Sequence, residues 1–406
     1  MQSKSLADIS KNISSGLTPL RSNPEFWDNG TIPWLKTEQL GEKYIYETNE
    51  HISNTALEKT SIKIVPENAL SIAMYGEGKT RGNISILKKA MATNQACCNV
   101  VIDPDKADYE YVYYFLKTQY DGLRNLSSGV RKNLNSNDIK TYPIRLPDNI
   151  DTQKSISKVL KAFDDKIELN NRINAELEAM AKTLYDYWFV QFDFPDANGK
   201  PYKTSGGKMV YNPTLKREIP KGWSDRTLSQ IANITMGQSP EGSSYNDEGV
   251  GTVFYQGSTD FGWLFPCTRQ YTTEPSRMAK KGDILLSVRA PVGDMNIANT
   301  DCCIGRGLAA LNCKTGFDGF LFYVMKYFKQ IFDRRNAEGT TFGSITKNDL
   351  YSLTLAYPTP DLLEKYDELV TNYNKMIFDR SLENRELIRL RDWLLPMLMN
   401  GQVTVK

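Results

Sequence analysis

The sequence is poor in the residues on which metal sites and acid–base catalysis most often depend. Its 406 residues include a single histidine, His51, so a His-rich metal site or a pair of catalytic histidines is excluded. His51 lies in the polar stretch NEHISN, which is typical of a solvated surface residue. The six cysteines form no CxxC pair and therefore lack the usual zinc-binding spacing.

Long apolar runs are also missing. No stretch of 18 consecutive apolar residues occurs, and the N-terminal MQSKSLADISKN resembles neither a secretory leader nor a transit peptide. Hydrophobic residues make up 40% and charged residues 24%, which is typical of a folded soluble protein. The net charge of +2 does not by itself indicate a partner. We therefore expect a reduced, cytoplasmic protein.

The loops that bind nucleotides are incomplete. GEGKT at Gly76 lacks the first glycine of a phosphate-binding loop, because Ala73 stands five residues before Gly78. IGRGLAA at Ile304 lacks the second half of a dinucleotide fingerprint. Pro195-Asp196 with Lys200 lacks the acidic residue that a nuclease metal motif requires. The sequence therefore does not support a stand-alone nuclease or methyltransferase.

A long amphipathic stretch from Ile156 to Phe189 is the strongest positive feature. Its apolar residues follow the 4-3 rhythm of a coiled-coil seam, and an asparagine within such a seam lowers stability but fixes register. The predicted seam of this helix comprises Leu160, Phe163, Ile167, Asn174, Leu177 and Leu184.

The chain repeats this helix after 210 residues. GTIPWLKTEQL at Gly30 parallels GTVFYQGSTDF at Gly251, and NDIKTYPIRLP at Asn137 parallels NDLYSLTLAYP at Asn348. The same offset gives a second seam, which comprises Ile377, Asn384, Leu387 and Leu394. Each helix has an apolar stripe without a partner in its own half, so we expect the two helices to pack antiparallel against each other.

These patterns predict an α+β fold. Two mixed α/β domains would be separated by an intramolecular antiparallel coiled coil and related by an approximate two-fold axis. The predicted divisions are residues 1–148 for the first domain, 149–190 for the central helix, 191–222 for a connector, 223–358 for the second domain and 359–406 for the C-terminal helix and tail. The connector is rich in proline and glycine. Its Lys200, Lys203 and Lys208 are interpreted as a solvated face, with contact to a polyanion as the alternative.

Lysine and arginine alternate with Asn, Gln, Ser and Thr in the turns of both domains. Arginine and the amide side chains are the favoured partners of base edges, while lysine mainly contacts phosphates. The alternative for each residue alone is an ordinary surface polar group, but the recurrence in both halves favours DNA recognition. In the first domain the candidates are Lys36, Thr37, Lys79, Thr80, Arg81, Asn94, Gln95, Arg131, Lys132 and Asn133. In the second they are Gln256, Ser258, Arg289, Arg306, Thr340, Thr341 and Lys347.

Three stretches resemble the specificity subunits of type I restriction-modification systems. They are DDKIELNNRINAELEAMAKTLYDYWF at Asp164, FDFPDANGKPYKTSGGKMVYNPTLKREIPKGW at Phe192 and LRDWLLPMLMNGQV at Leu390. The resemblance implies two target recognition domains that each read one half of a split, asymmetric duplex DNA site, with the coiled coil acting as a ruler. It also implies two methylation subunits docked along the helices and two motor/restriction subunits in the full complex.

The resemblance places the chemistry on those partners. They would supply S-adenosylmethionine, ATP and Mg²⁺, with no catalytic residue, metal or cofactor in this chain. The alternative function is a coiled-coil scaffold with two protein-binding modules and no DNA readout.

Overall fold

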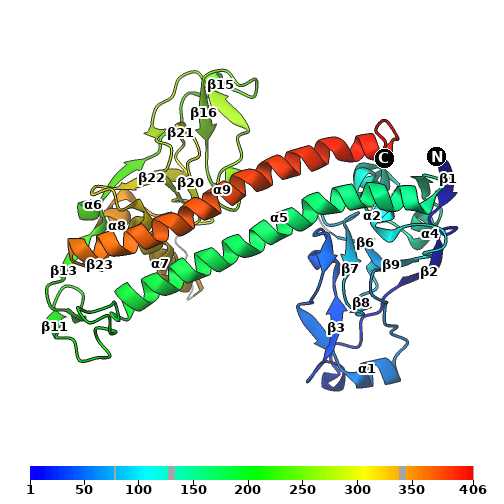
Figure 1. Ribbon diagram of the computed structural model, residues 1–406, viewed down its shortest axis with the longest axis horizontal. Coiled ribbons are helices and arrows are strands. Elements are labelled where there is room, and N and C mark those ends of the chain that lie inside the picture. The colour runs from blue at the N-terminus through cyan, green and yellow to red at the C-terminus, as the bar shows by residue number, and fades with distance from the viewer. Residues whose placement is uncertain (77–78, 127–132, 338–343, 406) are drawn as a thin grey trace. The chain divides into compact units, whose positions relative to one another are not determined.

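The computed structural model describes residues 1–76, 79–126, 133–337 and 344–405, and it divides into two compact units (Figure 1). Unit 1 comprises Met1–Ile167 and Arg385–Lys406, and unit 2 comprises Glu168–Asn384. Both divisions fall inside the long helices α5 (Ile150–Tyr185) and α9 (Pro360–Met399), so each unit contains one globular part and part of both helices. The functional domain boundaries given above stay a prediction.

Unit 1 is built on three sheets. Their strand orders are β2-β9-β6-β7-β4, β5-β3-β8 and β1-β10. The central strands β6 and β9 are almost wholly apolar and buried, as expected for strands covered on both faces. The strands are β1 (Gln2–Ser5), β2 (Ser10–Ser15), β3 (Ile32–Leu35), β4 (Tyr44–Ile45), β5 (Glu50–Ile52), β6 (Leu70–Ala73), β7 (Ile84–Leu87), β8 (Ala92–Thr93), β9 (Cys97–Ile102) and β10 (Pro143–Leu146).

Short helices complete unit 1. α2 begins after Asp108, whose carboxylate accepts a hydrogen bond from the Tyr111 amide, and α4 begins with a capping box of Asn135 and Asp138. The α-helices are α1 (Asn54–Lys59), α2 (Tyr109–Thr118), α3 (Tyr120–Asn125) and α4 (Ser136–Lys140), and the 3-10 turns are η1 (Pro24–Phe26) and η2 (Thr37–Gln39).

Unit 2 repeats this plan. Its sheets have the orders β14-β22-β19-β20, β15-β17-β16-β21-β18 and β13-β23, with a separate β11-β12 hairpin. The strands are β11 (Met209–Asn212), β12 (Arg217–Pro220), β13 (Ser224–Thr227), β14 (Ala232–Met236), β15 (Tyr245–Asn246), β16 (Thr252–Tyr255), β17 (Gln270–Thr272), β18 (Met278–Ala279), β19 (Ile284–Ser287), β20 (Met295–Ile297), β21 (Cys302–Ile304), β22 (Leu308–Cys313) and β23 (Thr354–Tyr357). The helices are α6 (Leu228–Ile231), η4 (Gly242–Ser244), η5 (Ser258–Asp260), α7 (Asp318–Ala337) and α8 (Lys347–Ser352).

The internal repeat and the mixed α/β class predicted from the sequence are confirmed. The order β2-β9-β6-β7 in unit 1 corresponds to β14-β22-β19-β20 in unit 2, and β5-β3-β8 corresponds to β17-β16-β21. The equivalent pairs β3 with β8 and β16 with β21 are both parallel, and unit 1 has a further parallel pair, β4 with β7. α2 follows β9 in unit 1 and α7 follows β22 in unit 2. Each of these two helices shares a hydrophobic core with residues of α5 and α9.

The two long helices run antiparallel, as residue contacts within each unit show. In unit 2, Asn174 donates a hydrogen bond to Ser381 at 3.4 Å, and Asn384 donates one to Asn171 at 2.8 Å. These two pairs are equivalents under the 210-residue offset. Asn170 also donates to Asn384 at 2.8 Å, so the polar layer is continuous. In unit 1, Leu160 of α5 shares a core with Leu398 near the end of α9.

The predicted seam residues differ in exposure. Leu160, Asn174, Leu177, Ile377 and Asn384 are buried. The half-buried seam residues are Phe163, Ile167, Leu184, Leu387 and Leu394.

The central helix does not end at Tyr185, because a π-helical turn, η3 (Asp186–Val190), continues it. The connector that follows contains the β11-β12 hairpin, which the proline and glycine content had hidden. Across the ranges that the structure describes, no helix is long and apolar enough to span a membrane.

Candidate nucleic-acid interface

The parallel strands β3 and β8 end at the same edge of a sheet in unit 1. Their register pairs Trp34 with Ala92, and the chain beyond each strand carries the predicted residues. The Asn94 amide donates to the Leu35 carbonyl at 2.9 Å, which holds the two strand ends together. Lys36 and Gln95 therefore lie at one place in the fold, although they are 59 residues apart in the sequence.

Unit 2 has the same arrangement at the ends of β16 and β21. The register pairs Tyr255 with Ile304, and the Gly305 amide donates to the Tyr255 carbonyl at 2.8 Å. Gln256 and Arg306, both exposed, follow these strands. They occupy the positions that Lys36 and Gln95 occupy in unit 1.

Backbone hydrogen bonds extend this edge to a third strand end in unit 1. The Met74 amide, just beyond β6, donates to the Ala96 carbonyl at 2.8 Å, and the Leu134 amide donates to the Met74 carbonyl at 3.1 Å. The segment that contains Asn133 therefore joins the ends of β3 and β8. We call the surface formed by Lys36, Asn94, Gln95 and Asn133 the polar edge of unit 1.

The polar edge of unit 2, defined by Gln256, Arg289, Arg306 and Ser344, is built by equivalent bonds. The Val288 amide donates to the Gly307 carbonyl at 2.9 Å, and the Ile345 amide donates to the Val288 carbonyl at 2.8 Å. Arg289 is exposed and pairs through its backbone with Ser344. The same scaffold thus presents different side chains in the two units.

Ion pairs occupy the polar edge of unit 1. Lys36 Nζ lies 2.7 Å from a carboxylate oxygen of Glu38 and 2.7 Å from one of Glu50, and Arg21 also pairs with Glu50. The Arg21 guanidinium holds the pKa of the Glu50 carboxyl below its ordinary value, with Lys36 adding to the effect. The hydroxyl of Thr18 donates to the Gln95 side chain. The cations of this edge are therefore held in place by acids before any ligand binds.

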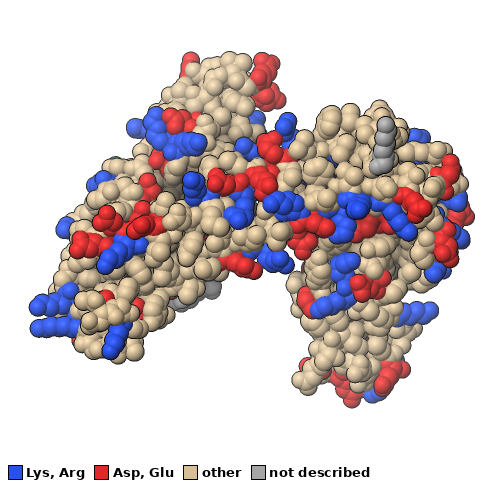
Figure 2. Space-filling model, in the orientation of Figure 1, with Lys and Arg blue, Asp and Glu red and all other residues tan. Residues whose placement is uncertain are grey.

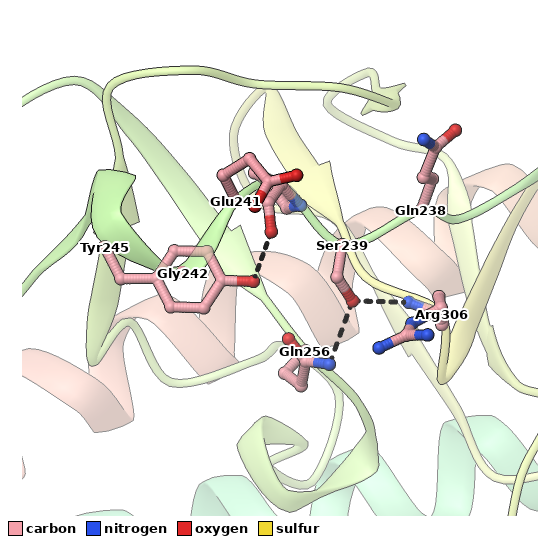
Figure 3. Close-up of a pocket in the computed structure, with 8 residues that line it drawn as sticks. Gln238, Ser239, Glu241, Gly242, Tyr245, Gln256 and Arg306 are labelled. Carbon is pink, nitrogen blue, oxygen red and sulfur yellow. Dashed lines mark hydrogen bonds between the residues drawn. The ribbon is translucent and has the colours of Figure 1, made fainter.

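The polar edge of unit 2 borders a depression (Figure 3). A depression of about 640 Å³ is lined by Gln238, Ser239, Pro240, Glu241, Gly242, Tyr245, Gln256 and Arg306. The Gln256 amide donates to the Ser239 hydroxyl at 3.0 Å, and the Arg306 backbone amide donates to the same oxygen at 3.3 Å. Among the residues that the structure describes, the Arg306 guanidinium has no acidic partner, so its donors are available to a ligand.

The other predicted residues of unit 1 lie near the polar edge of unit 1 or outside the described ranges. Lys79, Thr80 and Arg81 belong to the β6-β7 turn, where the Tyr120 hydroxyl donates to the Lys79 carbonyl at 2.6 Å. Thr37 begins η2. Arg131 and Lys132 lie outside the described residues.

In unit 2, Ser258 begins η5 and Lys347 begins α8. Lys347 is exposed, and its Nζ lies 5.0 Å from the centre of the Tyr351 ring. Thr340 and Thr341 lie outside the described residues. DNA contact by any of these candidates remains a prediction.

The sequence reasoning missed Thr18 and Ser239, which hold equivalent positions. Both follow a glycine, in GLTP at Gly16 and GQSP at Gly237, and this recurrence was the signal that would have found them. A Cβ on Gly16 would lie 2.1 Å from the Thr93 oxygen, and one on Gly237 would lie 2.2 Å from the Gly305 oxygen. Glycine is required there because the backbone passes directly over the strand ends.

No group of three or more His, Cys, Asp or Glu residues in the described ranges is arranged to hold a metal ion. His51 lies partly exposed, with Nε2 3.7 Å from Glu47.

Comparison with known proteins identifies one family. The family model described as type I restriction modification DNA specificity domain matches residues 1–179 and 220–365, which correspond to the two halves of the repeat. The putative type I restriction enzyme MjaX specificity subunit of Methanocaldococcus jannaschii is 31% identical over 317 residues, covering 76% of this chain and 71% of that protein. The MjaIX specificity subunit of the same organism is 26% identical over 424 residues, covering 99% and 93%. The crystal structure of a type I restriction-modification S subunit from M. genitalium has a similar fold, with a TM-score of 0.59, 17% identity and coverage of 98% and 95%.

Proposed function

Because the chain belongs to the type I restriction modification DNA specificity family, we propose that it reads a bipartite, asymmetric site in duplex DNA, one half with each polar edge. The observation that carries this proposal is the repeated edge. The same three strand ends are joined by equivalent backbone hydrogen bonds in both units, yet the side chains at equivalent positions differ. A common scaffold with different donors is suited to reading two different half-sites.

The two polar edges carry different side chains at equivalent positions, and these side chains favour different contacts with DNA. Gln95 in unit 1 corresponds to Arg306 in unit 2, and Lys36 corresponds to Gln256. Arginine favours guanine and glutamine favours adenine in the major groove, whereas lysine mainly positions the backbone. The two half-sites are therefore expected to differ in sequence.

The helices would set the spacing between the half-sites. α5 has 36 residues, which is about 54 Å at 1.5 Å per residue. The buried layer of Asn170, Asn174 and Asn384 supports a fixed register between the helices. In this proposal one heptad, about 10 Å, corresponds to roughly three base pairs.

The chain acts in this proposal as a non-catalytic subunit. Two methylation subunits would dock on the long helices, and two motor/restriction subunits would join the full complex in the cytoplasm. S-adenosylmethionine, ATP and Mg²⁺ would be bound by those partners.

Exposed apolar residues on the helices support such docking. Met180 on α5 is 53% exposed and its repeat equivalent on α9, Leu390, is 43% exposed. Each has a large neighbour on the same helix face, Tyr187 seven residues after Met180 and Trp393 three residues after Leu390. Two exposed apolar faces that share one pair of equivalent residues, Met180 and Leu390, fit two copies of one partner.

The test is a map of methylated adenines in cells that express this chain with its methylation partner. We expect one bipartite motif that depends on this gene. Arg306→Ala should relax one half-site and Gln95→Ala the other, each by about 1–3 kcal/mol of discrimination if the side chain contacts a base. Asn233→Ala, on an exposed part of β14, serves as the surface control.

Insertion of one heptad into both helices extends the same experiment. It should change the spacer and leave both half-sites unchanged. An unchanged spacer would contradict the ruler, and a motif that is continuous or independent of this gene would contradict the function. If the chain is a scaffold without DNA readout, binding to duplex DNA will show no steep dependence on salt.

A further inference from the structure

The connector concentrates positive charge. Residues 200–221 contain six cations and one acid, Glu218, and therefore carry a net charge of +5. The whole chain carries +2, so the remainder of the chain carries −3. Lys and Arg atoms project from the region of β11 in the space-filling view (Figure 2). The cations are Lys200, Lys203, Lys208, Lys216, Arg217 and Lys221.

These charges stand on an ordered scaffold. Phe194 stacks on Tyr202 with ring centres 4.6 Å apart and on Trp223 at 5.3 Å. Arg217 is part of this scaffold, since its guanidinium donates to the Val190 carbonyl at 3.1 Å and lies 4.4 Å from the centre of the Phe192 ring. The five lysines remain exposed.

Three of the nearby acids already accept hydrogen bonds, and Glu218 on β12 is exposed. Asp193 accepts hydrogen bonds from the Thr204 amide and hydroxyl at 2.7 Å each, and Asp196 accepts them from the amides of Asn198 and Lys200. Asp225 accepts one from Asn212 at 2.9 Å. Within the described part of the chain, none of the five lysines forms an ion pair.

Two of the lysines face each other across the hairpin. The Lys221 amide donates to the Lys208 carbonyl at 2.9 Å, which continues the antiparallel ladder of β11 and β12 by one step. Like charges directly opposite on neighbouring strands destabilise a hairpin. An anion placed between them would relieve this repulsion.

We propose that the basic hairpin, defined by Lys200, Lys203, Lys208, Lys216 and Lys221, binds the phosphate backbone of duplex DNA without reading its bases. The proposal rests on the DNA-binding function proposed above and adds a contact separate from the two polar edges. Lysine is a point charge that holds phosphates and carries little sequence information.

The surroundings of the lysines favour DNA over an acidic protein. Val210 and Tyr211 are exposed, but successive residues of a strand point to opposite faces, so these side chains do not form one apolar patch. Asn212, the amide side chain within the strand pair, is engaged by Asp225 and by the Leu215 amide. The hairpin thus offers charge without an apolar centre or a free base-reading group.

The experiment compares two variants of the full chain in complex with its methylation subunits. One carries Lys203→Gln, Lys208→Gln, Lys216→Gln and Lys221→Gln, and the other carries Lys→Arg at the same four positions. Binding to random duplex and to duplex with the mapped methylation site is measured over a salt series. The Gln variant should lower the slope of log affinity against log salt by about 0.9 for each lysine that contacts a phosphate, or by about 3 to 4 in total. The Arg variant should keep the wild-type slope.

The expected loss applies equally to both duplexes, and the methylated sequence stays the same, because phosphate contacts do not specify bases. A Gln variant with the wild-type slope on site-specific DNA would overturn this proposal while leaving the proposed function intact. Absence of DNA binding by the wild-type complex would instead overturn the proposed function. An unchanged slope with salt-sensitive loss of a partner subunit would assign the hairpin to protein binding and overturn the proposal as well.

Discussion

The contact between the globular part and the long helices includes a buried ionic group in unit 1 and an aromatic cluster in unit 2. In unit 1, Lys43 Nζ lies 2.9 Å from Glu110 and 3.1 Å from Asp164, and Arg391 lies 2.8 Å from Asp164. In unit 2 the rings of one cluster meet with centres 4.8 to 6.3 Å apart. The cluster consists of Tyr185, Phe189, Phe320 and Tyr366.

Equivalent positions can be matched by shared hydrogen bonds. The Ile86 amide donates to the Lys43 carbonyl at 2.7 Å, and the Ile297 amide donates to the Leu264 carbonyl at 2.8 Å, so Leu264 corresponds to Lys43. Lys43 lies beside β7 and Leu264 lies beside β20, and these two strands hold equivalent places in their sheets. One member of the ionic group is therefore an aliphatic residue in unit 2.

The helices show the same exchange. The Tyr114 hydroxyl donates to Asp164, and the Tyr323 hydroxyl lies 3.2 Å from Asn374, which is the residue 210 positions after Asp164. The same offset places Ala181 at the position of Arg391. At these two positions unit 2 has an amide and an alanine in place of charges while a tyrosine contact is kept. Unit 2 still has one ion pair between α7 and α5, since Lys326 lies 2.7 Å from Glu178.

The ionic group and the aromatic cluster contribute to stability in different ways. A buried ion pair costs desolvation and is often no more stable than an apolar replacement, but removal of one partner leaves an uncompensated charge. Aromatic burial contributes directly to stability. We therefore expect unit 2 to depend on ring volume and unit 1 to depend on having all its charges together.

Truncation of the aromatic cluster should have the largest effect. Phe189 is buried and lies 4.8 Å from the Tyr366 ring and 5.0 Å from the Phe320 ring. Phe189→Ala should destabilise unit 2 by about 3–5 kcal/mol, because it removes buried surface and leaves a cavity. Hydrogen exchange resolved by peptide would measure the loss in α7, while α2 of unit 1 stays protected.

Phe189→Leu is the matched control for that variant. It keeps much of the apolar volume and should recover more than half of the lost protection in α7. Equal loss of protection in both variants would mean that ring packing does not stabilise the junction.

Removal of one charge should have the next largest effect. Asp164→Ala removes the carboxylate that Lys43 and Arg391 share. Lys43 then keeps one acid, Glu110, and Arg391 keeps one acid, Asp392. We expect a loss of about 3 kcal/mol in unit 1, near the lower end for a broken buried pair. Hydrogen exchange in α2 would report it.

Removal of several charges at once tests the explanation. The triple change Lys43→Leu, Glu110→Gln and Asp164→Asn removes the three most buried charges and leaves Arg391 paired with Asp392. Leu and Asn are the residues of unit 2 at the positions of Lys43 and Asp164. The variant should cost less than Asp164→Ala alone, within about 1–2 kcal/mol of the wild type. If the three changes instead add to a larger loss, the ionic group contributes net stability and the comparison with unit 2 fails.

The elements with a periodic sequence pattern could be predicted from the sequence. The long helices, the repeat and the residues at strand ends, such as Gln95 and Arg306, follow from apolar patterns of two and 3.5 residues and from a fixed offset. Such patterns can be recognised because they lie within a short stretch of the chain or occur twice in it. The DNA contacts of these residues stay predictions.

The ionic junction was not predictable in this way. Asp164 and Arg391 are 227 residues apart, and the seam pattern does not say which outward-facing residues meet. The same holds for the polar layer, since antiparallel packing pairs Asn174 with Ser381 rather than with its equivalent, Asn384. Equivalent residues of an antiparallel pair face each other only at the symmetry axis.

The pH response should provide the smallest difference between the units. Burial at the α7–α9 contact raises the pKa of the Asp367 carboxyl above its ordinary value, although the Phe320 amide donates to this carboxyl at 3.3 Å and opposes the shift. A raised pKa in the folded state means that folded unit 2 binds the proton more tightly than the unfolded chain does, so the charged carboxylate costs stability. Unit 2 should therefore gain stability as the pH falls through the raised pKa toward 3.8, the ordinary value for aspartate. Hydrogen exchange in α7, corrected for intrinsic rates, should show this gain in the wild type and not in Asp367→Asn. The equivalent residue in unit 1 is Ser157, so α2 should lack this response, and a matching gain in α2 would refute the assignment to Asp367.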